Sequence, residues 1–209
     1  MARAIAPALV EAEDLLIYDL EGRSMNPGGR AEFAERYIHA AIYRARPDVV
    51  SVVHNHSPSV IPFGISSVPL RPVYHMSAFI GDGLPVFDIR HTAGITQMLV
   101  DGPERGRALA ESLGSANGVL MRGHGAVVVA PSLQLAVARG VYLELNARIQ
   151  LQAIGLGAPV TYLDPLEARA FVESGELSSF ARAWELWKRQ ALGDSSETMP
   201  TGTTRAPGD

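Results

Sequence analysis

The histidines of residues 52–58 have a spacing that could hold a metal ion. A β-branched run, 49–53, leads into His54 and His56, which are separated by one residue. Because side chains alternate between the two faces of a strand, both imidazoles project from the same face if the strand continues through them. Two imidazoles on one face make half of a metal site of the zinc or manganese type. The alternative, commoner for this motif alone, is a pair of solvated or core-bonded histidines.

A third histidine lies between two further apolar runs. Residues 118–122 and 126–130 both have the composition of buried strands, and a Gly-His-Gly sequence centred on His124 joins them. This pattern predicts a hairpin or adjoining strands with the histidine exposed at the bend, where glycines permit unusual dihedral angles and close approach to a ligand. A tight turn with a solvated histidine is the alternative. Three imidazoles are the usual count of neutral protein ligands for a catalytic divalent metal.

A carboxylate is predicted to face the same interior. Residues 32–46 have apolar side chains at helical spacing, and Pro47 ends the pattern. In such a helix Glu35 shares a face with Ile38 and His39, so its carboxylate is directed inward. An inward carboxylate needs a partner such as a metal ion, whereas a Glu–His pair at the surface is the alternative.

The elements that position these residues also leave local signals. Ser132 is suited to cap a long helix that runs to about Ala153, and Asp101 to cap a helix at 103–113. Further expectations are a strand and turn at 17–22, a short helix within the loop 58–72, a strand at 86–89, a loop at His91, and an apolar helical stripe of Leu177, Phe180, Trp184 and Trp187.

These motifs together resemble those of a known family. Glu35-x-x-x-His39, His54-x-His56 and the glycine-flanked His124 before a long helix are similar to the class II aldolase/adducin family over residues 15–163. The resemblance implies an α/β fold with three α/β/α layers and a central, mainly antiparallel sheet. It also implies one divalent metal, manganese or zinc with iron as another option, held by His54, His56 and His124. Glu35 is then either a ligand or an acid/base, and a homotetramer with active sites between subunits is expected.

Two features depart from the sugar-phosphate aldolases of the family. No Asn- and Gly/Ser-bearing phosphate loop precedes residues 17–22, so either the substrate lacks a phosphate or the chain starts inside the domain. His75 stands where those aldolases carry a proton-donating tyrosine, although Tyr74 is adjacent and a shifted alignment would restore the tyrosine. An imidazole with a pKa of about 6.5 and a phenol of about 10 donate protons in different pH ranges, which indicates different chemistry.

The family's decarboxylase branch is the closer resemblance. Its members remove a carboxylate from hydroxylated aromatic or pyridine dicarboxylates with a divalent metal, and residues 56–64, 70–75 and 121–125 are similar to theirs. Arg71 and Arg122 lie beside the proposed ligands in sequence, and a guanidinium suits bidentate binding of a carboxylate. An ordinary surface salt bridge is the alternative for each arginine.

The predicted function is therefore a metal-dependent lyase, with a decarboxylase favoured over an aldolase. The predicted catalytic residues are Glu35, His75 and Tyr74, and the predicted substrate contacts are Ser57, Arg71 and Arg122. One alternative is an aldolase or epimerase acting on a hydroxy-ketone or sugar phosphate, and another is an iron(II) oxygenase. A third is a non-catalytic, adducin-like assembly module, which has no need of a metal constellation.

Composition restricts the class of protein without selecting the chemistry. The chain has 209 residues, 47% of them hydrophobic, a net charge of −4 and no cysteine, so disulfides and thiolate ligands are excluded. A family domain over 1–192 and a disordered polar tail over 193–209 are expected. The absence of a basic cluster argues against nucleic-acid binding, and the absence of a long apolar run or signal pattern predicts a cytoplasmic protein that acts on a small molecule.

Overall fold

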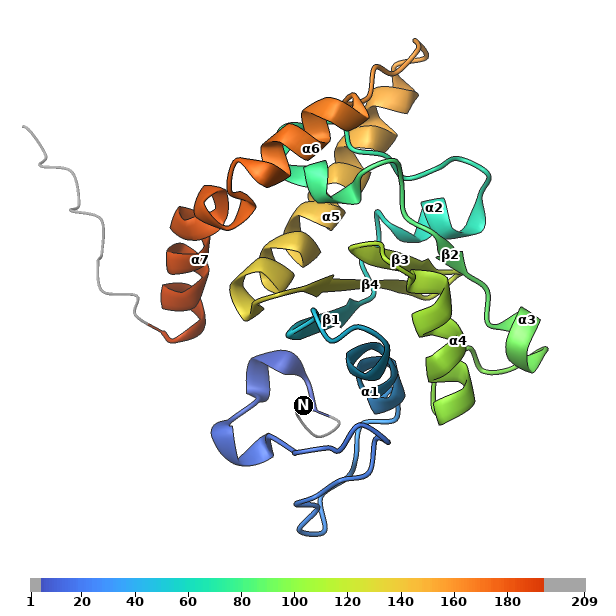
Figure 1. Cartoon of the computed structure of the whole chain (residues 1–209), viewed down its shortest axis with the longest axis vertical. Helices are drawn as coiled ribbons and strands as arrows, with labels where there is room; N and C mark the ends of the chain where they lie inside the picture. Colours follow the sequence, from blue (N-terminus) through green and yellow to red (C-terminus); the bar gives the residue numbers. More distant parts are fainter. Residues whose placement is uncertain (1–4, 194–209) are drawn as a thin grey trace, which may run out of the picture.

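The centre of the molecule is a four-stranded sheet with the strand order β1-β4-β3-β2 (Figure 1). The structure is a computed structural model that describes residues 5–193. Strands β1 (Ser51–Asn55) and β3 (Gly118–Met121) each pair antiparallel with β4 (Gly125–Ala130). Strand β2 (Val86–Phe87) runs parallel to β3. The prediction of a mainly antiparallel sheet is confirmed.

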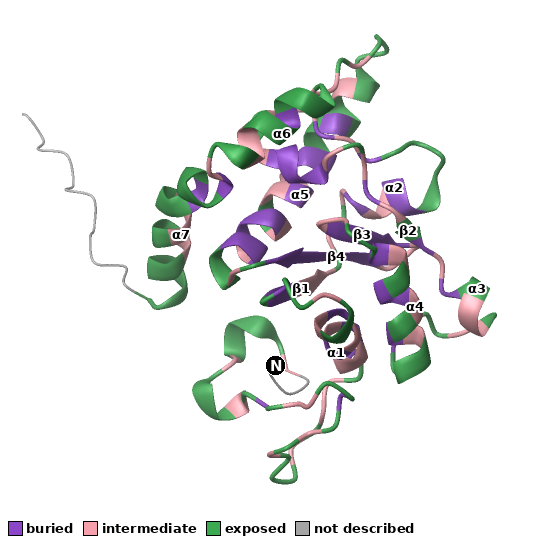
Figure 2. Ribbon diagram, viewed as in Figure 1, coloured by how far each residue is buried: buried purple, intermediate pink, exposed green. Residues whose placement is uncertain are grey.

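Helices cover both faces of this sheet (Figures 1 and 2). One face packs against α1 (Arg36–Ala45) and α4 (Pro103–Leu113). The other face packs against α2 (Ile61–Ile65), the 3-10 helix η3 (His75–Ile80) and α5 (Leu133–Gly155). The prediction of three α/β/α layers is therefore confirmed.

Strand β4 shows why both layers are needed. Val127 and Val129 are buried in the cluster that contains α1 and α4, whereas Ala126 and Val128 are buried in the cluster that contains α5. Because both faces of β4 are covered, its sequence is a continuous apolar run instead of an alternating one. The side chains of β4 therefore anchor the hairpin of β3 and β4 in the hydrophobic core on both faces of the sheet.

The C-terminal helices attach to the α5 layer. These helices are α6 (Pro165–Glu173) and α7 (Glu176–Ala191). The other short elements of the chain are η1 (Pro7–Leu9), η2 (Ala12–Asp14) and α3 (Arg90–Ala93). A buried ion pair between Arg139 of α5 and Glu176 of α7, 2.7 Å long, and a stack of Phe180 on Tyr142 hold α7 against α5. Of the predicted apolar stripe, Phe180 is buried and Trp187 packs beside it, whereas Leu177 is exposed.

Most local predictions agree with the structure, and some are wrong. The Ser132 side chain caps α5 by accepting a hydrogen bond from the N–H of Leu135, as predicted. Residue 102 occupies the N-cap position of α4, because the carboxylate of Asp101 binds Arg105 instead. Residues 17–22 form no strand, since their backbone makes a single bridge, Tyr18 to Ser24.

Other boundaries differ by a few residues. The first main helix begins at Arg36 instead of residue 32, β2 has two residues where 86–89 were expected, and His91 lies in the short helix α3. Residues 194–209 of the predicted tail lie outside the described residues, so the domain limits at 1–192 and 193–209 stay predictions. Within residues 5–193, no helix is both long and apolar enough to cross a membrane.

Candidate metal centre

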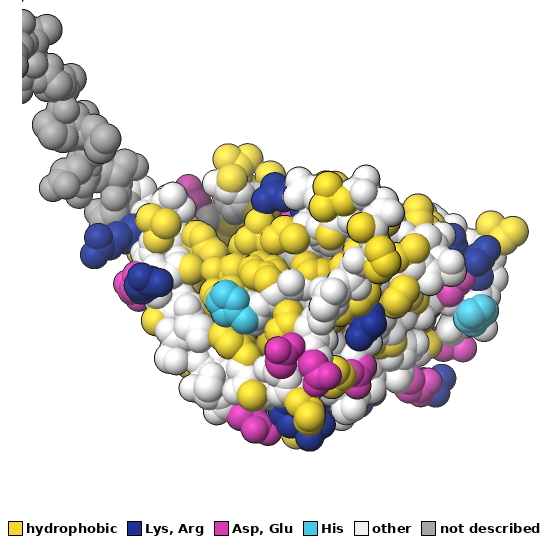
Figure 3. Space-filling model, turned by 90° about the horizontal axis from the view of Figure 1, so that it is seen from above, with side chains coloured by type: hydrophobic (Ala, Val, Ile, Leu, Met, Phe, Trp, Pro, Cys, Tyr) yellow, Lys and Arg dark blue, Asp and Glu magenta, His cyan; other side chains and the backbone are white. Residues whose placement is uncertain are grey.

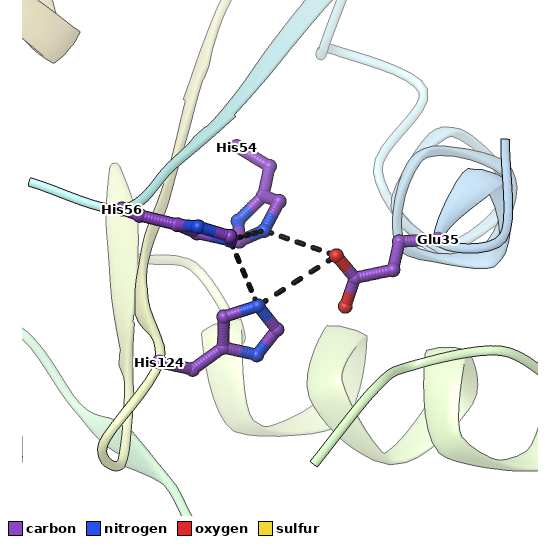
Figure 4. A group of neighbouring side chains, drawn as sticks. All are labelled: Glu35, His54, His56 and His124. Atoms are coloured by element: carbon purple, nitrogen blue, oxygen red, sulfur yellow. Dashed lines mark hydrogen bonds and ion pairs between the residues drawn. The ribbon is translucent and has the colours of Figure 1, made fainter. Parts of the chain in front are cut away.

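Four side chains that could bind a metal converge at one end of the sheet (Figure 4). Glu35 directly precedes α1, His54 lies in β1, His56 follows β1, and His124 lies in the turn between β3 and β4. One ligand atom of each residue lies within 4.8 Å of those of the other three. The structure thus brings together the three predicted metal ligands and the predicted carboxylate.

The sheet explains the direction of His54. Val52 of β1 is buried in the α1 and α4 layer, and His54, two residues later, lies on the same face. In the β1–β4 register His54 stands opposite Val127, which is buried in that same layer. The carboxylate reaches the histidines because α1 packs on this face, and Glu35 at the start of that helix points toward the three rings (Figure 4).

The two glycines beside His124 have different roles. Gly123 has a φ of +64°, a backbone conformation that residues with a side chain rarely adopt. At Gly125 a Cβ would lie 3.0 Å from both the carbonyl carbon of Asn55 and the Cα of His56, and closer still to the carbonyl oxygen of Asn55. The sequence predicted that this turn comes close to a ligand. The close backbone approach at Gly125 is instead made to the end of strand β1, and it places His56 beside the hairpin.

Backbone carbonyls orient two of the imidazoles. The Nδ1–H of His54 donates to the carbonyl of Ala126 at 3.0 Å, and the Nδ1–H of His124 donates to the carbonyl of Met98 at 3.1 Å. Because a carbonyl oxygen only accepts, each bond fixes the proton on Nδ1 and leaves the Nε2 lone pair facing the centre. Histidines that bind a metal in proteins usually have this arrangement, in which the ring nitrogen away from the metal donates to a carbonyl or carboxylate oxygen.

The distances between the ring nitrogens favour a cation between them. His56 Nε2 lies 3.1 Å from His54 Nε2 and 2.9 Å from His124 Nε2. Two of these atoms are acceptors, so such short separations need a proton or a metal ion between the rings. Donor atoms that each lie about 2.0–2.2 Å from one ion would be separated by roughly 3–3.5 Å. The site therefore fits a single divalent cation.

Glu35 supplies the negative charge of the centre. Its side chain is 4% exposed, with Oε2 at 3.3 Å from His54 Nε2 and 3.6 Å from His124 Nε2. Burial alone would raise the pKa of Glu35. The adjacent His54 ring, whenever its Nε2 carries a proton, and the N–H of Val100, which donates to Oε1 at 3.1 Å, outweigh it and lower that pKa. Burial lowers the pKa of His124, against the opposing effect of Glu35. The centre thus combines an ionised carboxylate with an imidazole that favours its neutral form.

Of the predicted substrate contacts, Arg122 and Ser57 lie beside the centre in the chain. Arg122 is two residues before His124, and its Nε lies 3.0 Å from the carboxylate of Asp88. Asp88 also binds Arg90, whose hydrogen bonds hold the pKa of Asp88 well below its usual range. The N–H of Ser57 donates to the side chain of Asn55 at 3.3 Å, within the loop that follows His56.

The other three predicted site residues lie on the α5 side of the sheet. The Arg71 guanidinium stacks 4.4 Å from the ring of Tyr162, and the exposed ring of His75 lies 5.3 Å from that of Phe171. Burial raises the pKa of Tyr74 to about 12, and its buried hydroxyl has no hydrogen-bond partner among residues 5–193. The structure does not bring these residues to the four-residue centre of their own chain, so their roles stay predictions.

Two buried amides that the sequence analysis did not identify hold this second group in place. Asn146 accepts from the N–H of Val73 at 2.9 Å and donates to the carbonyl of Arg71 at 2.8 Å. Gln150 accepts from the N–H of Arg71 at 3.0 Å and donates to the carbonyl of Pro69 at 2.8 Å. Two buried amides four residues apart in the long helix were the signal that could have revealed this, because a buried amide needs hydrogen-bond partners.

A cavity of about 490 Å³ lies apart from the centre. It is lined by residues of α1, α4 and the turn at Leu20 and Glu21, and none of the predicted site residues contributes to its wall. The four-residue centre is therefore identified by its possible metal ligands and not by the size of a cavity.

The fold and the centre define a three-layer α/β protein with a histidine–carboxylate site that could hold one metal ion. The chain belongs to the class II aldolase and adducin family, since the model of the Class II Aldolase and Adducin N-terminal domain matches residues 3–151. It is 34% identical over 212 residues to the decarboxylase tropJ of Talaromyces stipitatus, an alignment that covers 91% of this chain and 80% of the relative. The 3,4-dihydroxyphthalate decarboxylase of Rhodococcus jostii is 25% identical, with 85% of this chain and 74% of that protein covered.

Solved structures support the same fold. An aldolase II superfamily protein from Pseudomonas syringae superposes with a TM-score of 0.69 at 22% identity, over 93% of this chain and 82% of the other. An L-fuculose 1-phosphate aldolase from Glaciozyma antarctica gives a TM-score of 0.68 at 22% identity, over 91% and 73%. At this level of identity the likeness supports the fold alone.

Proposed function

We propose that the protein is a metal-dependent carboxy-lyase that removes carbon dioxide from a hydroxylated aromatic or pyridine carboxylate. One observation carries the proposal: three imidazoles and one ionised carboxylate meet at a point in a chain that is 34% identical to a protein named a decarboxylase. Relatives named 3,4-dihydroxyphthalate decarboxylase, among them those of Rhodococcus jostii, Arthrobacter keyseri and a Terrabacter species, favour an aromatic dicarboxylate.

The donor set restricts the choice of metal. The chain has no cysteine, so nitrogen and oxygen atoms are its strong ligands. His54, His56 and His124 would hold the ion, and Glu35 either completes the ligand set or moves a proton through a bound water. Manganese and zinc suit these donors, and iron(II) is a further option because three histidines with open positions also bind it.

The chain's own residues account for the rest of the reaction. Decarboxylation breaks a carbon–carbon bond, releases carbon dioxide and leaves a ring carbon that must take up a proton. A bound divalent ion would supply a Lewis acid near the substrate's hydroxyl and carboxylate oxygens. Arg122, two residues from His124, would hold the carboxylate that remains, and Ser57 would contact it from the loop after His56. Arg71 is the second candidate for this contact.

The proton donor is proposed to come from a neighbouring subunit. His75 is exposed and lies away from the centre of its own chain, whereas the Tyr74 hydroxyl is buried and has a pKa raised to about 12. An imidazole donates a proton at neutral pH far more readily than such a phenol, so His75 is the better candidate. A homotetramer with active sites between subunits would bring His75 of one copy to the centre of another.

The outer side of α5 supports such an assembly. Hydrophobic side chains gather on the face of the molecule that is uppermost in Figure 1, as the view from above shows (Figure 3). On α5, Val141 and Ile149 are exposed although the opposite side of the helix is already buried in the core. A helix that is apolar on all sides usually has a partner on each side.

An aldolase is the second candidate. The 5-deoxy-D-ribulose 1-phosphate aldolase of Bacillus thuringiensis is 29% identical over 161 residues, with 75% of this chain and 71% of that protein covered. The same centre would serve an aldolase, because both reactions develop negative charge next to a carbonyl or hydroxyl oxygen. An adducin-like assembly module would not need the four converging residues.

One experiment separates these possibilities. Purified protein is analysed for bound metals, stripped with a chelator, and reloaded with manganese, zinc or iron(II). Release of carbon dioxide is then measured across a panel of hydroxylated aromatic and pyridine dicarboxylates. Metal-dependent release supports the proposal. Cleavage of a sugar phosphate or hydroxy-ketone without any carbon dioxide would support the aldolase, and a protein that binds no metal would contradict both enzymes.

A further inference from the structure

An irregular segment, residues 96–101, supports two of the four centre residues from outside. The carbonyl of Met98 accepts the Nδ1–H of His124 at 3.1 Å. Two residues later, the N–H of Val100 donates to Oε1 of Glu35, also at 3.1 Å. One segment thus orients an imidazole from the β3–β4 turn and a carboxylate from the start of α1.

This segment has a backbone conformation that its surroundings must maintain. Met98 has a φ of +65°, and within the described part of the chain it is the only residue other than glycine with a positive φ. Such a conformation is unfavourable for a residue with a side chain and persists only where neighbouring contacts hold it. Locally, the N–H of Met98 donates to Thr96 Oγ1 at 2.9 Å, and the Gln97 amide donates to Asp101 at 3.0 Å.

A contact from α4 holds the middle of the segment. Nη1 of Arg105 donates to the carbonyl of Leu99 at 3.2 Å and also binds the carboxylate of Asp101. Leu99 stands between the two residues that contact the centre, so this bond restrains the peptide groups on either side. The Arg105 side chain is 25% exposed, which is less than a freely solvated arginine.

Helix α4 is itself packed tightly on α1. A Cβ at Gly106 would lie 2.5 Å from the carbonyl oxygen of Tyr37, so only glycine permits this approach of the two helices. Arg105 is the neighbour of Gly106, and Tyr37 lies two residues after Glu35. The same turn of α4 therefore positions both the segment 96–101 and the start of α1.

We propose that Arg105 is a positioning residue for the metal centre. By holding the Leu99 carbonyl, it keeps Met98 and Val100 where they orient His124 and Glu35, and so it sets the affinity of the centre for a divalent cation. The proposal rests on the proposed function only in requiring that the centre binds a metal. Loss of groups that orient metal ligands typically weakens metal binding by 10- to 100-fold, whereas a surface pair of Arg105 and Asp101 alone would contribute little.

The test compares two arginines of the same helix. Arg105→Met keeps the length of the side chain and removes its donors. Arg107→Met is the matched control, because Arg107 is exposed and its ion pair is with Glu111 on the helix surface. The dissociation constant for zinc is measured on stripped protein by competition with a chromogenic chelator. We expect Arg105→Met to raise it by about 10-fold or more and Arg107→Met to leave it within about 2-fold of the original.

Further measurements separate positioning from general stability. Thermal melts of the stripped proteins report the fold without metal, and a role in folding alone would lower the melting temperature without changing zinc affinity. Arg105→Lys should recover part of the affinity, because an ammonium group can still reach one acceptor. Thr96→Val, which removes the acceptor of the Met98 N–H, should weaken zinc binding in the same direction.

The outcomes distinguish this proposal from the proposed function. If the original protein binds zinc and Arg105→Met binds it equally well, the role of Arg105 is refuted and the metal centre remains. Equal weakening by both arginine variants would also refute it, since a general loss of positive charge would then be the cause. If the original protein binds no metal, both the centre and the role of Arg105 are rejected.

Discussion

The glycines on either side of His124 allow a sharp test of how the centre is built. Gly125→Ala should disrupt the site, whereas Gly123→Ala should leave it nearly intact. A Cβ at Gly125 would lie 3.0 Å from the Cα of His56 and from the carbonyl carbon of Asn55, where ordinary contacts are 3.4–4 Å. A Cβ at Gly123 would have no neighbour closer than 3.9 Å.

The expected magnitudes follow from these contacts. Accommodating the new methyl at residue 125 requires β1 and β4 to separate where His56 leaves the sheet, and such overpacking costs about 1–3 kcal/mol. At residue 123 the cost is the positive φ alone, about 1–2 kcal/mol. For a chain of this size, each kcal/mol lowers the melting temperature by roughly 2–4 °C. Displacement of His56 should also weaken zinc binding by about 10-fold or more for Gly125→Ala only.

The assay measures both consequences on the same samples. Thermal melts of the stripped proteins give the change in stability, and competition with a chelator gives the zinc affinity. Native zinc affinity and native stability in Gly125→Ala would refute the close approach of the hairpin to β1. Equal losses of zinc affinity in the two variants would show that the turn conformation, and not the strand contact, positions the ligands.

Four further predictions concern the metal, the proton donor, the arginines and pH. Removing the metal with a chelator should lower the melting temperature, since a ligand at 1,000 times its dissociation constant stabilises a protein by about 4 kcal/mol; an unchanged melt would contradict a metal in the folded centre. His75→Ala should reduce the catalytic rate by roughly two to four orders of magnitude without changing metal content, whereas loss of turnover in Tyr74→Phe alone would indicate the aldolase-like alignment. Arg122→Ala should mainly raise KM and should do so more than Arg71→Ala, because Arg122 lies two residues from His124; steady-state kinetics on the best dicarboxylate decide this. Burial, with a smaller contribution from His54, lowers the pKa of His39 to about 4. In the unfolded chain His39 takes up a proton near pH 6.5, whereas in the folded protein it stays neutral until about pH 4. The free energy of unfolding should therefore fall as the pH drops from about 6.5 to about 4, by at most roughly 3 kcal/mol. His39→Gln should make urea unfolding of the stripped protein less sensitive to pH in this window, and an identical pH dependence would place the titrating group elsewhere.

The local patterns of the sequence predicted a large part of the centre. The period of two in β1 directs His54 to the face of the α1 and α4 layer, His56 follows directly after the strand ends, and the hairpin puts His124 at a bend. The face shared by Glu35 and Ile38 likewise directs the carboxylate inward, as the burial of both residues bears out. These predictions succeed because the direction of a side chain depends on the backbone of its own strand or helix.

Contacts between distant segments were not predictable in this way. Residues 17–22 were expected to form a strand and a turn, but they find no neighbouring strand to pair with and make only the bridge from Tyr18 to Ser24. The bonds of Met98 and Val100 to the centre come from a segment without periodicity. In each case the outcome depends on which group the fold places within hydrogen-bond range.

The amino-acid sequence by itself determined the family, the layers of the fold and the identity of four converging side chains. The family and the layers came from the resemblance of its motifs to those of known proteins, whereas the four side chains were identified from residue types and short periodic spacings within single elements of secondary structure. Only the tertiary structure decided that His75 and Arg71 lie on the α5 side, held by Asn146 and Gln150, and that Arg105 supports the segment behind the centre. Such placements depend on how whole elements pack across the sheet, and no short stretch of sequence contains that information.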